Sequence, residues 1–179
     1  MKKIIKLATK KGFSLAEMIT AFGISTIVLF STASLMLNSS RTSDRTQVQS
    51  KVDNDVAIAV EKIQKLLLEA KDFEIENNGT KITFHYPQKI NGNYQPNTTD
   101  ATTHSITLSG SDLIYSGTPD KPILSGIPET DPDTNSTPEI FSHGTHSKEI
   151  VIKLFANETT ASNKNVYSKV ITRVRPRNY

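Results

Sequence analysis

An apolar segment near the N-terminus constrains this chain more than any other feature. The 25 residues from Phe13 to Leu37 carry a single formal charge, the carboxylate of Glu17. At about 1.5 Å per residue, a helix of this length measures about 37 Å, and the hydrocarbon core of a bilayer is about 30 Å thick. The sequence therefore predicts a helix that can cross a membrane, with one ionisable group near its start. Because burying such a group costs free energy, its presence favours a function for Glu17.

The charges before this segment predict its orientation. Residues 1–12 form a basic leader with five lysines and no acidic residue. An excess of lysine marks the cytoplasmic flank of a spanning helix, so the N-terminus is expected inside and the residues after Leu37 outside. The formal net charge of the chain is +3, and without the five leader lysines it becomes 3 − 5 = −2. The basic balance therefore belongs to the leader and does not predict nucleic-acid binding by the remainder.

The junction between leader and apolar segment reads Lys11-Gly12-Phe13-Ser14-Leu15-Ala16-Glu17. It resembles the processing motif of type IV prepilins and pseudopilins, in which a short basic leader ends in Gly and is followed by Phe, a small or hydroxyl residue, Leu, an apolar residue and Glu. The resemblance implies cleavage after Gly12 by a membrane prepilin peptidase and N-methylation of the new terminus at Phe13. It also implies that Glu17 pairs with the Phe13 amine of a neighbouring subunit and sets the register of a filament.

The same resemblance implies partners, location and the kind of function. Expected partners are other pilin or pseudopilin subunits, the prepilin peptidase, an inner-membrane assembly platform, and membrane lipid before assembly. The expected location is a single-pass protein of the cell (inner) membrane that then enters a pilus or pseudopilus. Weaker likenesses at Leu66–Ala70 and Arg175–Asn178 resemble minor pilins and pseudopilins of the J and W types. Such a chain is a structural subunit and not an enzyme, and no nucleophile–base or paired-carboxylate spacing stands out.

Two other interpretations of the apolar segment stay open. An ordinary signal anchor would hold an extracytoplasmic surface protein whose β domain binds a ligand. A secretory signal peptide would be cut near residues 31–34, where small residues cluster. The position of Glu17 and a run longer than the usual length of about 7–15 residues weaken the signal-peptide interpretation.

A second helical pattern follows the apolar segment without a break. No glycine or proline lies between Gly23 and Gly79. The spacing predicts one helix from about Leu15 to Asp72, in which residues 13–37 span the membrane or fill a filament core and residues 38–73 form an amphipathic continuation. Its dry face recurs at steps of four and three residues, at Val48, Val52, Val56, Val60, Ile63, Leu67 and Ala70.

Residues 74–179 are expected to form an exterior β-rich domain. Residues 81–86 alternate between apolar and polar types, as a half-buried strand does. Further strands are predicted at 105–108, 112–115, 149–155 and 166–175, with a hairpin turn at Gly110-Ser111 and a central position for the strand at 149–155. Loops are predicted at 91–103 and at 117–139, which holds five prolines. A helix followed by antiparallel strands is an α+β fold. The chain has no cysteine, so no disulfide supports it.

One acidic loop invites comparison with a calcium site. Asp131, Asp133 and Asn135 place oxygen atoms at alternate residues, as the start of a calcium-binding loop does. Ser136 stands where an EF-hand needs glycine, and Ser142 stands where it needs glutamate. The EF-hand is therefore excluded, and a solvated acidic loop is favoured over another type of calcium loop. No metal or cofactor is predicted.

Two other clusters are given ordinary interpretations. His143 and His146 are too few for a metal site without further ligands, so they are expected to be solvated loop residues. Arg173 and Arg175 would share one face of a strand, with Arg177 nearby. Three arginines without an aromatic platform favour an exposed strand face over a nucleic-acid site.

Overall fold

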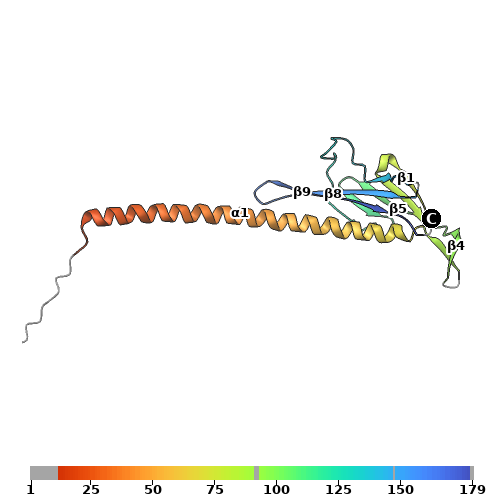
Figure 1. The fold of residues 1–179 in the computed structure, drawn as a ribbon, viewed down its shortest axis with the longest axis horizontal. Coiled ribbons are helices and arrows are strands. Elements are labelled where there is room, and N and C mark those ends of the chain that lie inside the picture. Colours follow the sequence, from red (N-terminus) through yellow and green to blue (C-terminus); the bar gives the residue numbers. More distant parts are fainter. Residues whose placement is uncertain (1–11, 91–92, 147, 178–179) are drawn as a thin grey trace, which may run out of the picture. The chain divides into compact units, whose positions relative to one another are not determined.

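The structure is a computed structural model that describes residues 12–90, 93–146 and 148–177. Figure 1 shows a long helix followed by antiparallel strands, which confirms the α+β class. The chain divides into two compact units, Met1–Ser43 and Asp44–Tyr179. The predicted leader falls almost entirely on residues 1–11, which lie outside the described residues.

Helix α1 runs from Leu15 to Leu68, beginning at the predicted residue and ending four residues before the predicted end. The amphipathic continuation therefore does not reach residue 73. Strand β1 takes residues Asp72–Glu76 and pairs antiparallel with β2, Lys81–His85. The apolar side chains of β1 oppose core residues of β2, because Phe73 pairs with Phe84 and Ile75 pairs with Ile82. Cross-strand packing of this kind stabilises residues 72–76 as a strand and not as a continuation of the helix.

The first sheet has the strand order β1-β2-β5-β6. Strand β5 covers His104–Ser109 and β6 covers Asp112–Tyr115, so the predicted hairpin is confirmed. Ser109 pairs with Asp112 across the two-residue turn, in which Gly110 adopts φ 61°. Two-residue hairpin turns need positive φ, which glycine supplies without strain.

The second sheet has the order β7-β8-β9, with β7 at Phe141–His143, β8 at Ile150–Thr159 and β9 at Asn165–Val174. Strand β8 is central, as its apolar run predicts. Ile152 and Leu154 are fully buried on one face of β8, and Phe155 is fully buried on the other.

The predicted loop at 91–103 is wrong in its middle part. Residues Asn93–Thr99 form strand β4, which pairs antiparallel with β3, Pro87–Ile90, as a separate two-stranded sheet. The sequence of β4 is rich in Asn and Thr and lacks apolar alternation, so its pattern resembles a loop.

The segment at 117–139 is irregular, as predicted, and all of it is described. It still joins the two larger sheets through backbone hydrogen bonds. The N–H of Leu113 in β6 donates to the oxygen of Leu124 at 2.8 Å, and the N–H of Asn157 in β8 donates to the oxygen of Gly126 at 2.8 Å. Leu124 and Ile127 of this segment are themselves buried. This proline-rich segment therefore contributes to the core.

The core of the second unit lies between the sheets and the C-terminal part of α1, which runs beside β8 and β9 (Figure 1). Gln64 of α1 donates to Thr172 of β9 at 2.8 Å, which marks the face of that sheet that meets the helix. The predicted dry stripe is confirmed, since the buried helix residues are Val52, Val56, Ala59, Val60, Ile63 and Leu67.

Candidate assembly site and charged clusters

The start of α1 is closed by a reciprocal pair of hydrogen bonds between Ser14 and Glu17. The Glu17 N–H donates to Ser14 Oγ at 3.2 Å, and the Ser14 N–H donates to Glu17 Oε2 at 2.8 Å. This is a capping box, which satisfies two backbone donors that the first helical turn leaves free. It also holds a negative charge at the helix N-terminus, where the macrodipole favours one. The Ser-x-x-Glu spacing of Ser14 and Glu17 is a local sequence signal for this cap.

The residues predicted to flank the cleavage site lie just before the helix. Gly12 and Phe13 have non-helical backbone, and the Phe13 side chain is 84% exposed. A Cβ atom added at Gly12 would meet no heavy atom within 4 Å, so the fold itself does not require glycine there. The structure therefore gives no packing reason for glycine at this position.

The helical part of the first unit presents apolar side chains on every side. The described residues include one helix long and apolar enough to cross a membrane, by length and composition. An exposed apolar surface this large needs lipid or protein to cover it. Its large apolar side chains are each at least 55% exposed, at Leu15, Met18, Ile19, Phe22, Ile24, Ile27, Val28, Leu29, Phe30, Leu35, Met36 and Leu37.

Five hydroxyl groups on the apolar part of α1 are satisfied within the helix. Thr20, Thr26, Ser31, Thr32 and Ser34 each donate to the carbonyl oxygen four residues earlier, at 2.7 to 3.0 Å. Such bonds remove the cost of placing a hydroxyl in an apolar medium. The segment is therefore compatible with lipid and equally with a dry bundle of helices.

Replacing Ser14 with alanine is expected to loosen the first turn of α1, because it removes the hydroxyl that accepts the Glu17 N–H. The loss of an N-cap residue costs about 1 kcal/mol, which corresponds to roughly fivefold faster local opening. Hydrogen exchange of the amides at residues 15–18, measured on the full chain in micelles, tests this. Ser25→Ala, inside the same helix, is the matched control and should leave those amides unchanged. Equal exchange in the two variants would contradict the capping role.

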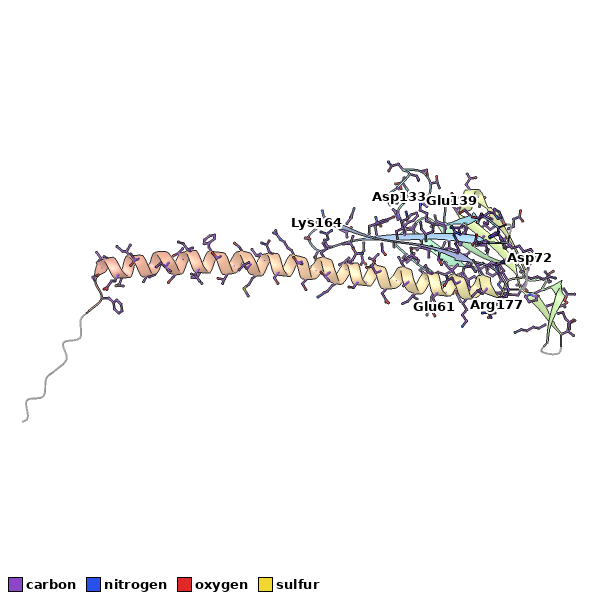
Figure 2. The ribbon with its side chains drawn as sticks, in the orientation of Figure 1. Glu61, Asp72, Asp133, Glu139, Lys164 and Arg177 are labelled. Carbon is purple, nitrogen blue, oxygen red and sulfur yellow. The ribbon has the colours of Figure 1, made fainter. Side chains whose placement is uncertain are left out.

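The acidic loop residues face lysines in the second sheet. Asp131 is 3% exposed, and its Oδ1 accepts the N–H of Asp133 at 2.9 Å. Its Oδ2 accepts from Lys153 Nζ, while Asp133 pairs with Lys169 and lies 3.7 Å from Lys153 Nζ. These contacts attach the loop to the face of β8 and β9 opposite α1, and Figure 2 shows Asp133 on that side. Lys153 and Lys169 could not be predicted as partners from the sequence, since no local pattern connects them to the loop.

The third calcium candidate has a backbone role in the same loop. Asn135 has φ 53°, and its N–H donates to the carbonyl oxygen of Asp131 at 2.8 Å. Asparagine tolerates this left-handed conformation better than most residues. Within the described parts of the chain, no three His, Cys, Asp or Glu side chains gather as metal ligands. Lysine ammonium groups occupy the positions beside the carboxylates where a cation would bind.

Acidification is expected to destabilise the second unit in part through Asp131. The hydrogen bond from Lys153, then that from the Asp133 N–H, holds the pKa of Asp131 below its ordinary value of 3.8. Because the folded pKa is lower than the unfolded one, the stabilisation is complete above the unfolded pKa and is lost as pH falls through the folded pKa. Asp131→Asn should remove this part of the acid dependence, as thermal midpoints against pH would show. Asp120→Asn, which changes an exposed residue of the same segment, should leave the acid dependence of the thermal midpoint unchanged. Identical pH profiles for Asp131→Asn and the unaltered chain would contradict the linkage.

The prediction that both histidines lie in a loop is wrong for His143, because this residue pairs with Ile150 as part of strand β7. His143 ends β7 and is exposed, with its ring centroid 5.9 Å from that of Phe73. His146 is exposed in the turn that follows. Neither contributes to a cluster of metal ligands among the described residues.

The C-terminal arginines are exposed, but they do not share one strand face. Strand β9 ends at Val174, so Arg173 belongs to the strand and Arg175 lies beyond it. The N–H of Arg177 donates to the oxygen of Leu68 at 3.0 Å, and Figure 2 shows Arg177 at this end of α1. The chain end is thereby attached to the helix by its backbone.

A hydroxyl, an imidazole and a carboxylate meet on the polar side of β1 and β2, which the sequence did not indicate. His85 Nδ1 lies 2.8 Å from Asp72 Oδ1, and His85 Nε2 lies 3.1 Å from Thr103 Oγ1. The order hydroxyl, imidazole, carboxylate is that of a catalytic triad. The side chains of His85 and Asp72 are 34% and 49% exposed, however, so water competes at the imidazole. The three side chains therefore fit a structural link between the ends of β1 and β2 and the residues before β5. They do not fit a site that activates the Thr103 hydroxyl as a nucleophile.

Compared with protein-family models, with curated proteins and with solved structures, the chain matches none of them. The architecture itself, a long N-terminal helix with an apolar first part followed by small antiparallel sheets, fits a pilin-like organisation.

Proposed function

We propose that this chain is a structural subunit, a minor pilin or pseudopilin, of a type IV pilus or a type II secretion-like filament. In this proposal a prepilin peptidase cleaves after Gly12, and Phe13 becomes the N-methylated mature terminus. The observation that carries the proposal is the start of α1. A glycine that the fold does not need precedes a capped helix, the cap contains Glu17, and the helix continues as an uncovered apolar surface.

Before cleavage, the chain is anchored in the cell membrane by residues 13–37. The leader lysines hold the N-terminus on the cytoplasmic side, and the second unit lies outside. The helix tolerates lipid because its hydroxyls bond to its own backbone.

Cleavage after Gly12 creates an ammonium at Phe13, one residue before the N-cap. An ammonium at a helix N-terminus is repelled by the positive end of the macrodipole, so it needs a carboxylate. The capping box keeps the Glu17 carboxylate at this end of the helix. A carboxylate offers about four acceptor positions, so the bond from Ser14 leaves capacity for an ammonium from a neighbouring subunit.

The mature helix then exchanges lipid for the helices of other subunits. An apolar helix surface is shielded from water both in lipid and among other helices. The axial register between neighbouring helices is therefore decided by side-chain packing and by the charge pair. A buried ion pair is a weak source of net stability, but it distinguishes one register from another because a misplaced partner leaves a charge uncompensated. The assembly platform and the other subunits are the partners that this step requires.

Isolation of the full chain from native membranes in a mild detergent tests the proposal. We expect other chains that begin with a basic leader, a Gly–Phe junction and an apolar helix to co-purify with it and to be identified by mass spectrometry. Recovery of the chain solely as a monomer would favour the rival function, a signal-anchored surface protein whose β domain binds a ligand, and would contradict the filament.

A further inference from the structure

A cleft of about 480 Å³ lies where the end of α1 meets the beginning of the β3–β4 hairpin. This volume falls within the range of small-molecule sites. The lining combines an aromatic ring with side chains that donate and accept hydrogen bonds. Its residues are Glu69, Tyr86, Pro87, Gln88, Lys89 and Asp100.

The aromatic ring in the cleft is held in place by a row of other rings. Tyr86 meets Phe84 edge to face at a centroid distance of 5.5 Å, and it meets His104 at 4.7 Å with an interplanar angle of 54°. His104 stacks on Tyr115 at 5.9 Å, and Tyr115 Oη lies 3.0 Å from His104 Nδ1. A ring fixed in this way loses little conformational freedom when a ligand covers it, which favours binding.

The polar groups of the cleft are anchored beside that ring. The backbone N–H of Asp100 donates to the carbonyl oxygen of Tyr86 at 2.8 Å, which holds the two residues side by side. Asp100 Oδ1 accepts the N–H of Thr102 at 3.3 Å, and a carboxylate has capacity for further bonds. Gln88 and Lys89 are exposed. The lining therefore contains two carboxylates, an ammonium and an amide, and among these Asp100 has acceptor capacity left while the Gln88 amide both donates and accepts.

We propose that this cleft binds a neutral saccharide. A pyranose ring has an apolar C–H face that can cover an aromatic ring, and it has hydroxyls around its rim that both donate and accept. An aromatic platform with mixed acceptors and donors at its edge matches both features. The formal charge of Glu69, Asp100 and Lys89 together is −1, which is too small to select a polycation and has the wrong sign for a polyanion.

With the second unit outside the cell, as in the proposed function, the position of the cleft suits an extracellular ligand. Within the second unit, α1 rises about 36 Å between Asp44 and Leu68, at about 1.5 Å per residue. The cleft beside Glu69 is therefore at the end of this unit remote from the point where the helix enters it. The inference goes beyond the proposed function and does not depend on cleavage or on filament assembly.

Saturation-transfer NMR on the full chain tests the proposal. The chain is held in a zwitterionic detergent, because the sugar head groups of maltoside detergents would compete. The probes are cellobiose, chitobiose, N-acetyllactosamine and maltose, with spermidine as the cationic alternative. We expect at least one disaccharide to receive saturation from the protein, with no comparable signal from spermidine.

Three variants test whether the saturation transfer comes from binding in the cleft. Gln88→Ala and Asp100→Ala each remove a hydrogen-bonding group, which costs about 1 kcal/mol, so affinity should fall roughly fivefold. Tyr86→Leu should abolish binding, and if that variant fails to fold, the Gln88 and Asp100 variants decide. Asp120→Ala, in the exposed part of the 117–139 segment, is the matched control and should bind normally. Absence of transfer to all four disaccharides, transfer unaffected by the variants, or a response to spermidine alone would overturn the proposal.

Discussion

Replacing Glu17 with valine is expected to abolish incorporation of the chain into filaments while cleavage after Gly12 continues. In the proposed filament, the variant leaves the Phe13 ammonium of the neighbouring subunit without a partner in a dry helical core. An uncompensated buried charge costs about 3–5 kcal/mol, which lowers assembly by more than a hundredfold. The measurement is the fraction of mature chain in sheared or sedimented filaments relative to the membrane.

Glu17→Gln separates the observed capping role of this side chain from its proposed role as a partner of the Phe13 ammonium. A glutamine at this position completes a capping box as well as glutamate does, because its amide oxygen accepts the Ser14 N–H. It carries no charge, so it cannot neutralise an ammonium. We therefore expect Glu17→Gln to keep the helix start and to lose incorporation as Glu17→Val does. Normal incorporation of the glutamine variant would show that Glu17 acts only as a cap.

Ile63→Ala is expected to be among the most damaging substitutions in the second unit. Ile63 is fully buried on the face of α1 that packs against the sheets. Truncation of a buried isoleucine to alanine costs about 2–5 kcal/mol through lost burial and the cavity that remains. A domain of this kind has a free energy of unfolding of about 5–15 kcal/mol, so the change removes a large share of it.

Urea unfolding of the full chain in micelles, followed by the circular dichroism of the β strands, measures this loss. Ile58→Ala is the matched control, since Ile58 lies on the same helix and is 54% exposed. The control should change stability by less than about 0.5 kcal/mol, as is usual for surface substitutions. Similar midpoints for the two variants would contradict the packing of this helix face on the sheets.

The helix and the strongly patterned strands could be predicted because their signals are local. The stripe that includes Val56 and Ile63 repeats at the helical period over five turns, and the Gly110-Ser111 turn separates two short apolar strands. Strands β1 and β4 could not be found in this way. The first follows the helical pattern without a break, and the second is polar, so each is determined by its pairing partner and not by its own composition.

Parts of the candidate site could be predicted and others could not, because some of its contacts are local in sequence and others are long-range. Gly12, Phe13 and Glu17 lie within six residues, so one motif joins them, and the capping role of Ser14 was available from the same stretch. The Asp131–Lys153 and Asp133–Lys169 ion pairs and the Tyr86–His104 ring contact join residues that are 18 to 36 positions apart. Contacts at that separation depend on sheet order and register, which no local pattern contains.

The mature N-terminus is the most direct test of the filament proposal. Mass spectrometry of the chain purified from its native membrane should find a polypeptide that begins at Phe13 and carries one N-methyl group. A chain that still begins at Met1, or one that begins near Leu35 after signal-peptide cleavage, would contradict it.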